Sequence, residues 1–231
     1  KIKEVQETSK GIREITEGEK GNGEWEAELL LVATGRGTNI ESLGLEAAGV
    51  VYGRDGIRVD ENYETNVRGI HAIGDVIGGQ LLAHVASEEG KLCVERMYGN
   101  VCEIDHRSIP SCVFAFPEVA VVGLTEEEAI EKGLSYSVGK FLFAANGKAV
   151  TMGETDGFIK TIVEKEGGRI LGVHIIGPHA SDLIHEGTLA IRQGLRVSHL
   201  EETVHAHPTL GEAFWESVMS TQDLAIHRLP G

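Results

Sequence analysis

Apolar residues near the amino end form short runs that favour strands. Residues 1–5 and 12–16 have the composition of two strands, and the glycine-rich segment 18–23 is typical of a turn. In residues 28–33 the apolar positions are consecutive rather than alternating, which predicts a strand buried on both faces. We therefore expect a small β-element followed by a strand inside a sheet.

The middle of the chain predicts a strand, a loop and a helix in succession. Residues 57–59 and 70–73 favour short strands. Residues 81–98 have the 3.6-residue apolar spacing of a helix, which opens after Gly78-Gly79. The loop between the second strand and the helix is centred on Gly74-Asp75.

Beyond Pro110 the pattern becomes that of amphipathic strands and helices. Gly167-Gly168 favours a hairpin turn, and Thr125 with Glu128 forms a capping box. Strands are predicted at 119–122, 137–144, 158–164 and 170–176, and helices at 125–132, 181–193 and 210–220. We therefore expect an α/β part followed, from a boundary near residues 107–111, by an α+β part with an antiparallel sheet.

Charge and cysteine spacing narrow the possible functions. Asp and Glu number 36 against 21 Lys and Arg, and the net charge of -15 argues against nucleic acid and anionic membranes as partners. Cys93, Cys102 and Cys112 match neither a redox pair nor a zinc site, so we expect reduced thiols and no metal. Reduced thiols, and the lack of an apolar run of about 18 residues, favour a cytoplasmic location.

The segment from His205 to Glu212 carries the clearest chemistry. An imidazole can act as a general base when a carboxylate fixes its tautomer, and Glu212 can do this for His207. His205 can equally be a packing residue with one hydrogen bond. We also expect the His207–Pro208 bond to be cis, because an X-Pro bond adopts that form at a cost of only about 0.5–1 kcal/mol.

A second candidate site ends the predicted strand at Gly74-Asp75. Glycine permits close approach of a ligand to the backbone, and the Asp75 carboxylate can accept hydrogen bonds from sugar hydroxyls. The structural alternative is a turn in which Asp75 caps a helix.

Both segments resemble motifs of the lipoamide dehydrogenase branch of the pyridine nucleotide-disulfide oxidoreductase family. Residues 205–212 are similar to its HxHPTxxE signature, although Gly211 stands where the family usually has Ser. Residues 65–75 are similar to its second FAD motif, TxxxxIxAIGD, and residues 31–36 to the ATGR motif of its NAD domain. Residues 144–178 are similar to its interface domain, so the resemblance spans nearly the whole chain.

The resemblance implies roles for particular residues. His207 would deprotonate a dihydrolipoamide thiol, with Glu212 orienting the ring. Asp75 would bind the ribityl hydroxyls of FAD. Other cofactor-binding positions would be Gly35 for NAD and Gly74, Leu81, Leu82, Ala83 and His84 for FAD.

The resemblance also implies a domain organisation and partners. Residues 1–38 would be the tail of an NAD-binding domain, 39–107 a returning segment of an FAD-binding domain, and 108–231 the interface domain of a homodimer. The complete protein would oxidise dihydrolipoamide with FAD and NAD. Its lipoyl-bearing partner would belong to a 2-oxoacid dehydrogenase or glycine cleavage complex.

Two family features are missing from the sequence. It contains neither the GxGxxG phosphate-binding loop nor the CxxxxC redox disulfide. We therefore expect the chain to be the carboxyl-terminal part of a longer enzyme and to be inactive alone. A non-catalytic dimerisation module and another disulfide reductase of the same family remain alternatives.

Overall fold

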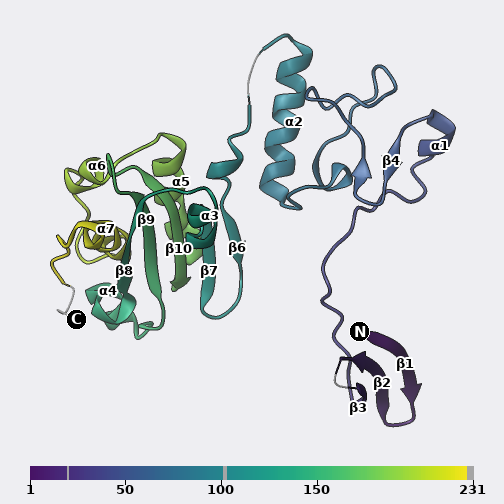
Figure 1. Ribbon diagram of the computed structural model, residues 1–231, viewed down its shortest axis with the longest axis horizontal. Helices are drawn as coiled ribbons and strands as arrows, with labels where there is room; N and C mark the ends of the chain where they lie inside the picture. The colour runs from purple at the N-terminus through teal and green to yellow at the C-terminus, as the bar shows by residue number, and fades with distance from the viewer. Residues whose placement is uncertain (20, 101–102, 228–231) are drawn as a thin grey trace.

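The computed structural model describes residues 1–19, 21–100 and 103–227, and their helices and strands fall into three units (Figure 1). We name them the amino-terminal meander (residues 1–27), the central unit (residues 40–98) and the carboxyl-terminal unit (residues 106–227). The carboxyl-terminal unit contains the largest sheet and most of the helices.

The amino-terminal meander is a sheet of three antiparallel strands, β1 (Ile2–Thr8), β2 (Gly11–Gly18) and β3 (Gly21–Ala27). The turn between β1 and β2 requires glycine, because Gly11 has φ 135° and a Cβ atom there would lie 2.3 Å from the Ala27 carbonyl oxygen. The two predicted strands are confirmed. The predicted turn at 18–23 is too long, since β2 and β3 pair up to Gly18 and Gly21.

The buried strand predicted at residues 28–33 is wrong. These residues form no strand, and Leu29, Leu31 and Val32 are 87%, 89% and 72% exposed. A strand buried on both faces needs neighbouring strands along its edges and helices over its faces. Among the described residues no strand pairs with this run, so most of its apolar side-chain surface stays exposed.

The central unit consists of short elements around one helix. They are α1 (Leu45–Ala48), β4 (Tyr52–Gly53), β5 (Gly56–Ile57), the 3₁₀ helix η1 (Gly74–Ile77) and α2 (Ala83–Met97). Its small core is built from Leu45, Val50 and Ile57. The helix predicted at 81–98 is confirmed as α2.

The two strands predicted in the central unit are wrong in extent. Beyond β4 and β5, pairing is limited to single bridges, one of them between Val59 and Thr65. The reason is a turn at Asp60, whose Oδ1 atom accepts hydrogen bonds from the amides of Asn62 and Glu64 at 2.8 and 2.9 Å. This turn reverses the chain before a longer ladder can form.

The carboxyl-terminal unit is built on a five-stranded antiparallel sheet with the order β6-β7-β10-β9-β8. Gly167 and Gly168, both at positive φ, close the hairpin between β9 and β10. The strands are β6 (Ser111–Val113), β7 (Glu118–Gly123), β8 (Tyr136–Leu142), β9 (Phe158–Glu164) and β10 (Ile170–Gly177). The predicted α+β architecture with an antiparallel sheet is confirmed.

The predicted helices of this unit are also present, and Thr125 and Glu128 form the capping box. The helical elements are η2 (His106–Ser108), α3 (Glu126–Glu131), η3 (Phe143–Ala145), α4 (Gly147–Met152), α5 (Ala180–Arg192), α6 (Val197–Glu201), α7 (Gly211–Met219) and η4 (Ser220–Gln222). Strand β6 and helices α4 and α6 were not predicted, because segments of three to six residues are too short to show a period.

Helices α5 and α7 cover the sheet, α5 over β7 and β10 and α7 over β8 and β9. Phe143, Ile159 and Phe214 are fully buried in the resulting core. Gly139 lets α7 approach β8 closely, because a Cβ atom there would lie 2.0 Å from the Ser217 carbonyl oxygen. The loop that precedes α7 is therefore anchored at its carboxyl end by a well-packed helix.

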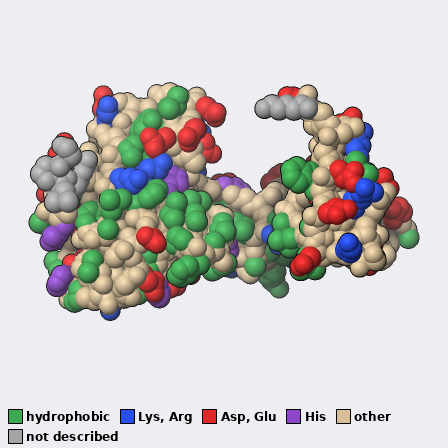
Figure 2. All heavy atoms as spheres, turned by 90° about the horizontal axis from the view of Figure 1, so that it is seen from below, with side chains coloured by type: hydrophobic (Ala, Val, Ile, Leu, Met, Phe, Trp, Pro, Cys, Tyr) green, Lys and Arg blue, Asp and Glu red, His purple; other side chains and the backbone are tan. Residues whose placement is uncertain are grey.

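The surface of the carboxyl-terminal unit is not uniformly polar. Hydrophobic side chains gather on the face of this unit shown in Figure 2. In the turn between β6 and β7, Phe114 and Phe116 are 81% and 95% exposed. Exposed apolar groups of this kind are typical of surfaces that contact other proteins.

Candidate active site

His207 and Glu212 lie together where the loop after α6 enters α7. The Nδ1 atom of His207 is 2.8 Å from Oε1 of Glu212, and the His207–Pro208 bond is cis, as predicted. Since a carboxylate only accepts hydrogen bonds, Nδ1 carries the proton and Nε2 is left as the acceptor nitrogen. The His207 side chain is 77% exposed, so Nε2 is available to a molecule arriving from outside.

Glu212 is the more buried member of the pair, with its side chain 24% exposed. Burial by itself raises the pKa of Glu212, but hydrogen bonds from the Thr209 amide and from His207 outweigh burial and lower the pKa below its usual value. The Thr209 amide donates to Oε2 at 2.8 Å. Glu212 is therefore an ionised carboxylate at neutral pH and accepts the hydrogen bond from His207.

Asn146 supports this loop from another part of the chain, and sequence reasoning gave it no role in the site. Its side chain is buried, and Nδ2 donates to the Thr209 carbonyl oxygen at 3.0 Å while Oδ1 accepts from the Ala149 amide at 2.9 Å. Asn146 is thus both the cap of α4 and a brace for the segment beside Glu212. An Asn before a helix signals the cap, but nothing local in the sequence signals the contact with Thr209.

His205 is tied into the protein rather than exposed beside His207. Its Nε2 atom is 2.8 Å from Oε1 of Glu186 in α5, and its Nδ1 atom is 3.1 Å from the Thr203 carbonyl oxygen. Only 13% of its side chain is exposed. His205 therefore links the loop to α5, which agrees with a packing role.

Gly211 is the first residue of α7. A Cβ atom at this position would meet only Oγ1 of Thr209, at 3.7 Å, which is an ordinary contact. The site therefore has room for a side chain at 211, and the glycine does not reflect a steric requirement.

The other predicted site residues gather between η1 and α2. The Gly74 amide donates to the buried carboxylate of Glu89 at 2.6 Å, and a Cβ atom on Gly74 would lie 2.8 Å from that of Ala86. Leu82 precedes α2 and offers no side-chain cap, so the first amides of the helix, including those of Ala83 and His84, have no acceptor within the helix.

Asp75 faces Arg36, the residue after Gly35. This contact places Arg36 beside η1 and the segment before α2. Arg36 Nη1 is 3.5 Å from Asp75 Oδ2, and Nη2 donates to the Leu81 carbonyl oxygen. The Asp75 side chain is 45% exposed. Gly35 itself is exposed, with φ 107° and no neighbour near its Cβ position. Sequence reasoning missed Glu89, because a Glu on a helix is usually solvated.

The structure does not bring the two groups of residues together. His207 and Glu212 lie beside α7, at the far side of the carboxyl-terminal unit from α2, whereas Gly74, Asp75 and residues 81–84 belong to the central unit (Figure 1). We call Gly74, Asp75 and residues 81–84 the Asp75 cluster. Within one chain, His207 therefore does not face this cluster.

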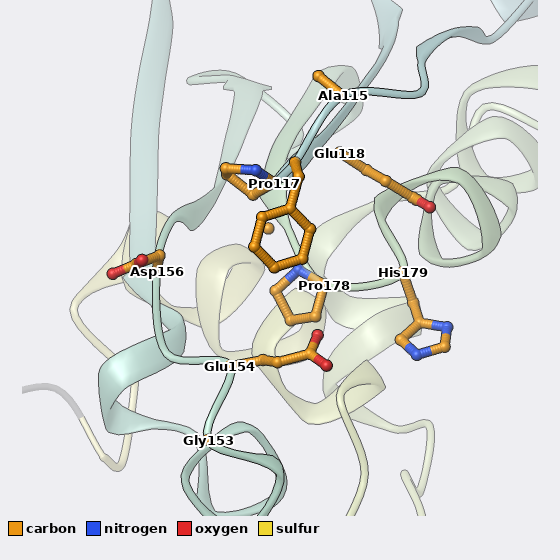
Figure 3. A pocket seen from close by; sticks show the side chains of 10 residues that line it. Ala115, Pro117, Glu118, Gly153, Glu154, Asp156, Pro178 and His179 are labelled. Carbon is orange, nitrogen blue, oxygen red and sulfur yellow. The ribbon is translucent and has the colours of Figure 1, made fainter.

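Another hollow, of about 270 Å³, contains none of the predicted residues (Figure 3). Glu118, Glu154, Pro178 and His179 are among the residues that line it. The Glu118 carboxylate accepts hydrogen bonds from the amide and hydroxyl of Ser181 in α5. Within the described parts of the chain, no cluster of three metal-ligating side chains is found. In the same residues, no helix has the length and apolarity to cross a membrane.

Family models match two parts of the chain. The model of the pyridine nucleotide-disulphide oxidoreductase family matches residues 1–90, and that of the dimerisation domain of the same family matches residues 109–218. Together they include most of the residues discussed above. The chain belongs to the pyridine nucleotide-disulphide oxidoreductase family.

Curated relatives within this family carry one name repeatedly. The chain is 42% identical over 230 residues to dihydrolipoyl dehydrogenase 2, mitochondrial, of Arabidopsis thaliana, and the match covers 98% of this chain and 45% of that protein. It is 43% identical over 226 residues to a dihydrolipoyl dehydrogenase of Bacillus subtilis, covering 97% and 48%. The chain thus spans just under half the length of these relatives.

Solved structures agree on the fold. LpdA from Mycobacterium tuberculosis matches with a TM-score of 0.83 and 26% identity over 94% of this chain and 47% of that chain. The flavoprotein disulfide reductase RclA from Escherichia coli, as its Cu(II) complex, matches with a TM-score of 0.86 and 26% identity over 94% and 49%.

Proposed function

We propose that the chain is the carboxyl-terminal part of an FAD- and NAD-dependent dihydrolipoamide dehydrogenase in which His207 is the general base. The observation that carries the proposal is the 2.8 Å hydrogen bond between His207 Nδ1 and Glu212, which leaves Nε2 exposed to accept a proton. The names of the curated relatives support the substrate. Residues 1–38 would then belong to the NAD-binding domain, 39–107 to the FAD-binding domain and 108–231 to the interface domain.

In this function His207 moves one proton. Nε2 takes it from a dihydrolipoamide thiol, and the resulting thiolate attacks the enzyme disulfide, which is not in this chain. Glu212 holds the ring through Nδ1 and stabilises the imidazolium until the proton is released. When bound, FAD would carry the electrons from the dithiol to NAD.

The residues between η1 and α2 fit the flavin role assigned to them. Asp75 presents an exposed carboxylate that can accept from hydroxyl groups, and Gly74 allows the backbone to pass close to α2. The uncapped start of α2 offers amides from Ala83 and His84. Gly35 would contribute to the NAD site together with parts of the enzyme outside this chain.

The complete enzyme would act as a homodimer in which His207 serves the disulfide of the other subunit. Two observations support this: the dimerisation-domain model matches residues 109–218, and His207 is remote from the Asp75 cluster of its own chain. Its protein substrate would be a lipoyl-bearing component of a 2-oxoacid dehydrogenase or glycine cleavage complex. A cytoplasmic location is part of the same proposal.

The test is the rate of NAD reduction by dihydrolipoamide in the complete protein. His207→Gln should lower kcat by about 10²–10⁴-fold, because the thiol loses its general base. His185→Gln, on the exposed side of α5, is the matched control and should keep the wild-type rate. A near-normal rate in His207→Gln would remove His207 from this role.

Another disulfide reductase of the same family is the second candidate, supported by the structural likeness to RclA. It is distinguished by substrate: the complete protein would then reduce a different disulfide with a reduced nicotinamide and leave dihydrolipoamide unchanged. A third possibility is that the chain acts alone as a non-catalytic dimerisation module. The purified chain should then form dimers without FAD and show no NAD reduction.

A further inference from the structure

A buried carboxylate holds the segment that follows α7. Glu216 is 3% exposed, and its Oε2 accepts from the Ile226 amide at 2.9 Å while its Oε1 accepts from His227 Nδ1 at 2.6 Å. The His227 amide is directed at the same carboxylate, 3.3 Å from Oε1. An unpaired carboxylate is strongly disfavoured inside a protein, so these donors explain how a Glu is accommodated on the buried side of α7.

The chain reverses direction after α7, which brings this segment back to Glu216. Asp223 follows η4 in the left-handed conformation, with φ 59°, and the Leu224 amide then donates to the Met219 carbonyl oxygen at 3.0 Å. Residues 224–227 (the returning tail) therefore run back along the helix rather than away from it.

The returning tail shares a cavity with the proposed base-orienting residue. Glu216 lies one helical turn beyond Glu212, so both carboxylates project from the same side of α7. Glu212, Glu216, Ile226 and His227 line one cavity of about 240 Å³, together with His205. Ile226 and His227 thus form a wall of the space beside Glu212.

The tail also affects Glu212 electrostatically. Burial raises the pKa of Glu212, the hydrogen bonds from Thr209 and His207 lower it, and the nearby charge of His227 lowers it further. The other charged groups lining this space are Glu201 and Glu216.

We infer that Glu216 is a positioning residue of this site: by holding Ile226 and His227 against α7, it maintains the wall that keeps Glu212 partly shielded and hydrogen-bonded to His207. Shielding strengthens the bond, because water competes less well for the carboxylate. The inference rests on the proposed function, since it assumes that His207 is the base. Glu216 itself contacts no reacting atom.

The test compares two activities of the complete protein in Glu216→Gln and His227→Ala. The first activity is NAD reduction by dihydrolipoamide, which needs the base. The second is NADH-dependent reduction of ferricyanide, which needs the flavin and the nicotinamide but no thiol base. Glu202→Gln removes an equal charge from the exposed end of α6 and is the matched control.

Glu216→Gln and His227→Ala should each lower kcat with dihydrolipoamide by about tenfold and leave its KM within about twofold, because a hydrogen bond to a charged group is weakened. The ferricyanide rate should stay at the wild-type value. His227→Gln should keep most of the activity, since its amide can still donate to Glu216. Glu202→Gln should be unchanged.

Wild-type kcat in both Glu216→Gln and His227→Ala would overturn the inference. An equal loss of both activities with a lowered thermal midpoint would also overturn it, because that pattern belongs to a structural anchor alone. A wild-type protein that reduces ferricyanide but does not oxidise dihydrolipoamide would overturn the proposed function, and the inference with it. An active wild type with unaffected variants would overturn the inference alone.

Discussion

Residues 28–33 and strand β9 are both rich in branched apolar residues, but they have opposite surroundings. Leu31 is 89% exposed, whereas Ile159 and Ile162 of β9 are 0% exposed. Strand β9 pairs with β8 on one edge and with β10 on the other, and all three strands lie within residues 136–177. Apolar composition therefore makes burial favourable, but the chain must also supply the partner strands.

The same contrast separates the two groups of candidate site residues. His207 and Glu212 are five residues apart, 2.8 Å from each other and backed by a packed helix. Arg36 and Asp75 are 39 residues apart, 3.5 Å from each other, and their side chains are 65% and 45% exposed. The geometry of His207 and Glu212 is fixed by one short segment that ends in a packed helix. The geometry of Arg36 and Asp75 depends on how two distant segments of the chain are held relative to each other.

The largest expected difference between these regions is in amide hydrogen exchange, measured by mass spectrometry at neutral pH. Residues 28–33 lack strand hydrogen bonds and should exchange at about the rate of an unfolded peptide. Amides of β9 should exchange at least about 10³-fold more slowly, because they open only with the unit as a whole. Equal protection of the two segments would show that residues 28–33 have found a partner.

The same comparison can be tested through stability, by shortening one buried and one exposed apolar side chain. Phe214→Ala should lower the free energy of unfolding of the carboxyl-terminal unit by about 3–5 kcal/mol, because it opens a cavity beneath α7. Leu31→Ala should change it by less than about 0.5 kcal/mol. Urea unfolding of the purified chain measures both, and a costly Leu31→Ala would contradict the exposed state of this segment.

Two glycines of the carboxyl-terminal unit should respond in opposite directions. Gly211→Ala should raise the free energy of unfolding by about 0.5–1 kcal/mol, because alanine favours the helix and the added Cβ atom meets only Thr209 Oγ1 at 3.7 Å. Gly139→Ala is the matched control and should destabilise, since its Cβ atom would lie 2.0 Å from the Ser217 carbonyl oxygen. Thermal unfolding of the two variants beside the wild type would show the opposite signs.

The smallest effect concerns pH. Burial raises the pKa of Glu212, but hydrogen bonds from Thr209 and His207 lower it overall, so the ionised carboxylate stabilises the folded state above the ordinary carboxyl pKa. This contribution is lost as the pH falls through the lowered pKa. The stability of the wild type should therefore decline more steeply than that of Glu212→Gln between about pH 5 and pH 3. The free energy of unfolding of both proteins can be measured with urea at each pH. If the two values decline in parallel, the hydrogen bonds to Glu212 do not stabilise the folded state.

Much of the carboxyl-terminal unit could be predicted from its pattern. The strands at 158–164 and 170–176 and the helix after Leu210 follow from alternation, from the Gly167-Gly168 turn and from helical spacing. These signals are reliable there because a tight hairpin joins β9 to β10 and because α7 finds the sheet that its apolar face needs in β8 and β9. At 57–59 and 70–73 the same composition gave wrong strands, because the turn at Asp60 prevents a longer ladder.

The contacts of the candidate site also separate into local ones, which could be predicted, and long-range ones, which could not. The contact between His207 and Glu212 and the cis bond at Pro208 were expected from a segment of eight residues, and the structure has both. The support from Asn146, the link from His205 to Glu186 and the bond from Glu89 to Gly74 were not predicted. Each of these joins residues that are 15 to 63 positions apart, and no local pattern signals such pairs.

The sequence by itself determined the periodic elements, the family motifs and the pairing of His207 with Glu212, because each depends on residues within one or two turns of chain. The tertiary structure decided which apolar runs are buried, and that Glu216 holds the returning tail beside Glu212. It also decided that His205 is linked to Glu186 in α5. These outcomes depend on the order of strands and on contacts between distant segments, and the free energy of those contacts is not encoded in any single stretch of sequence.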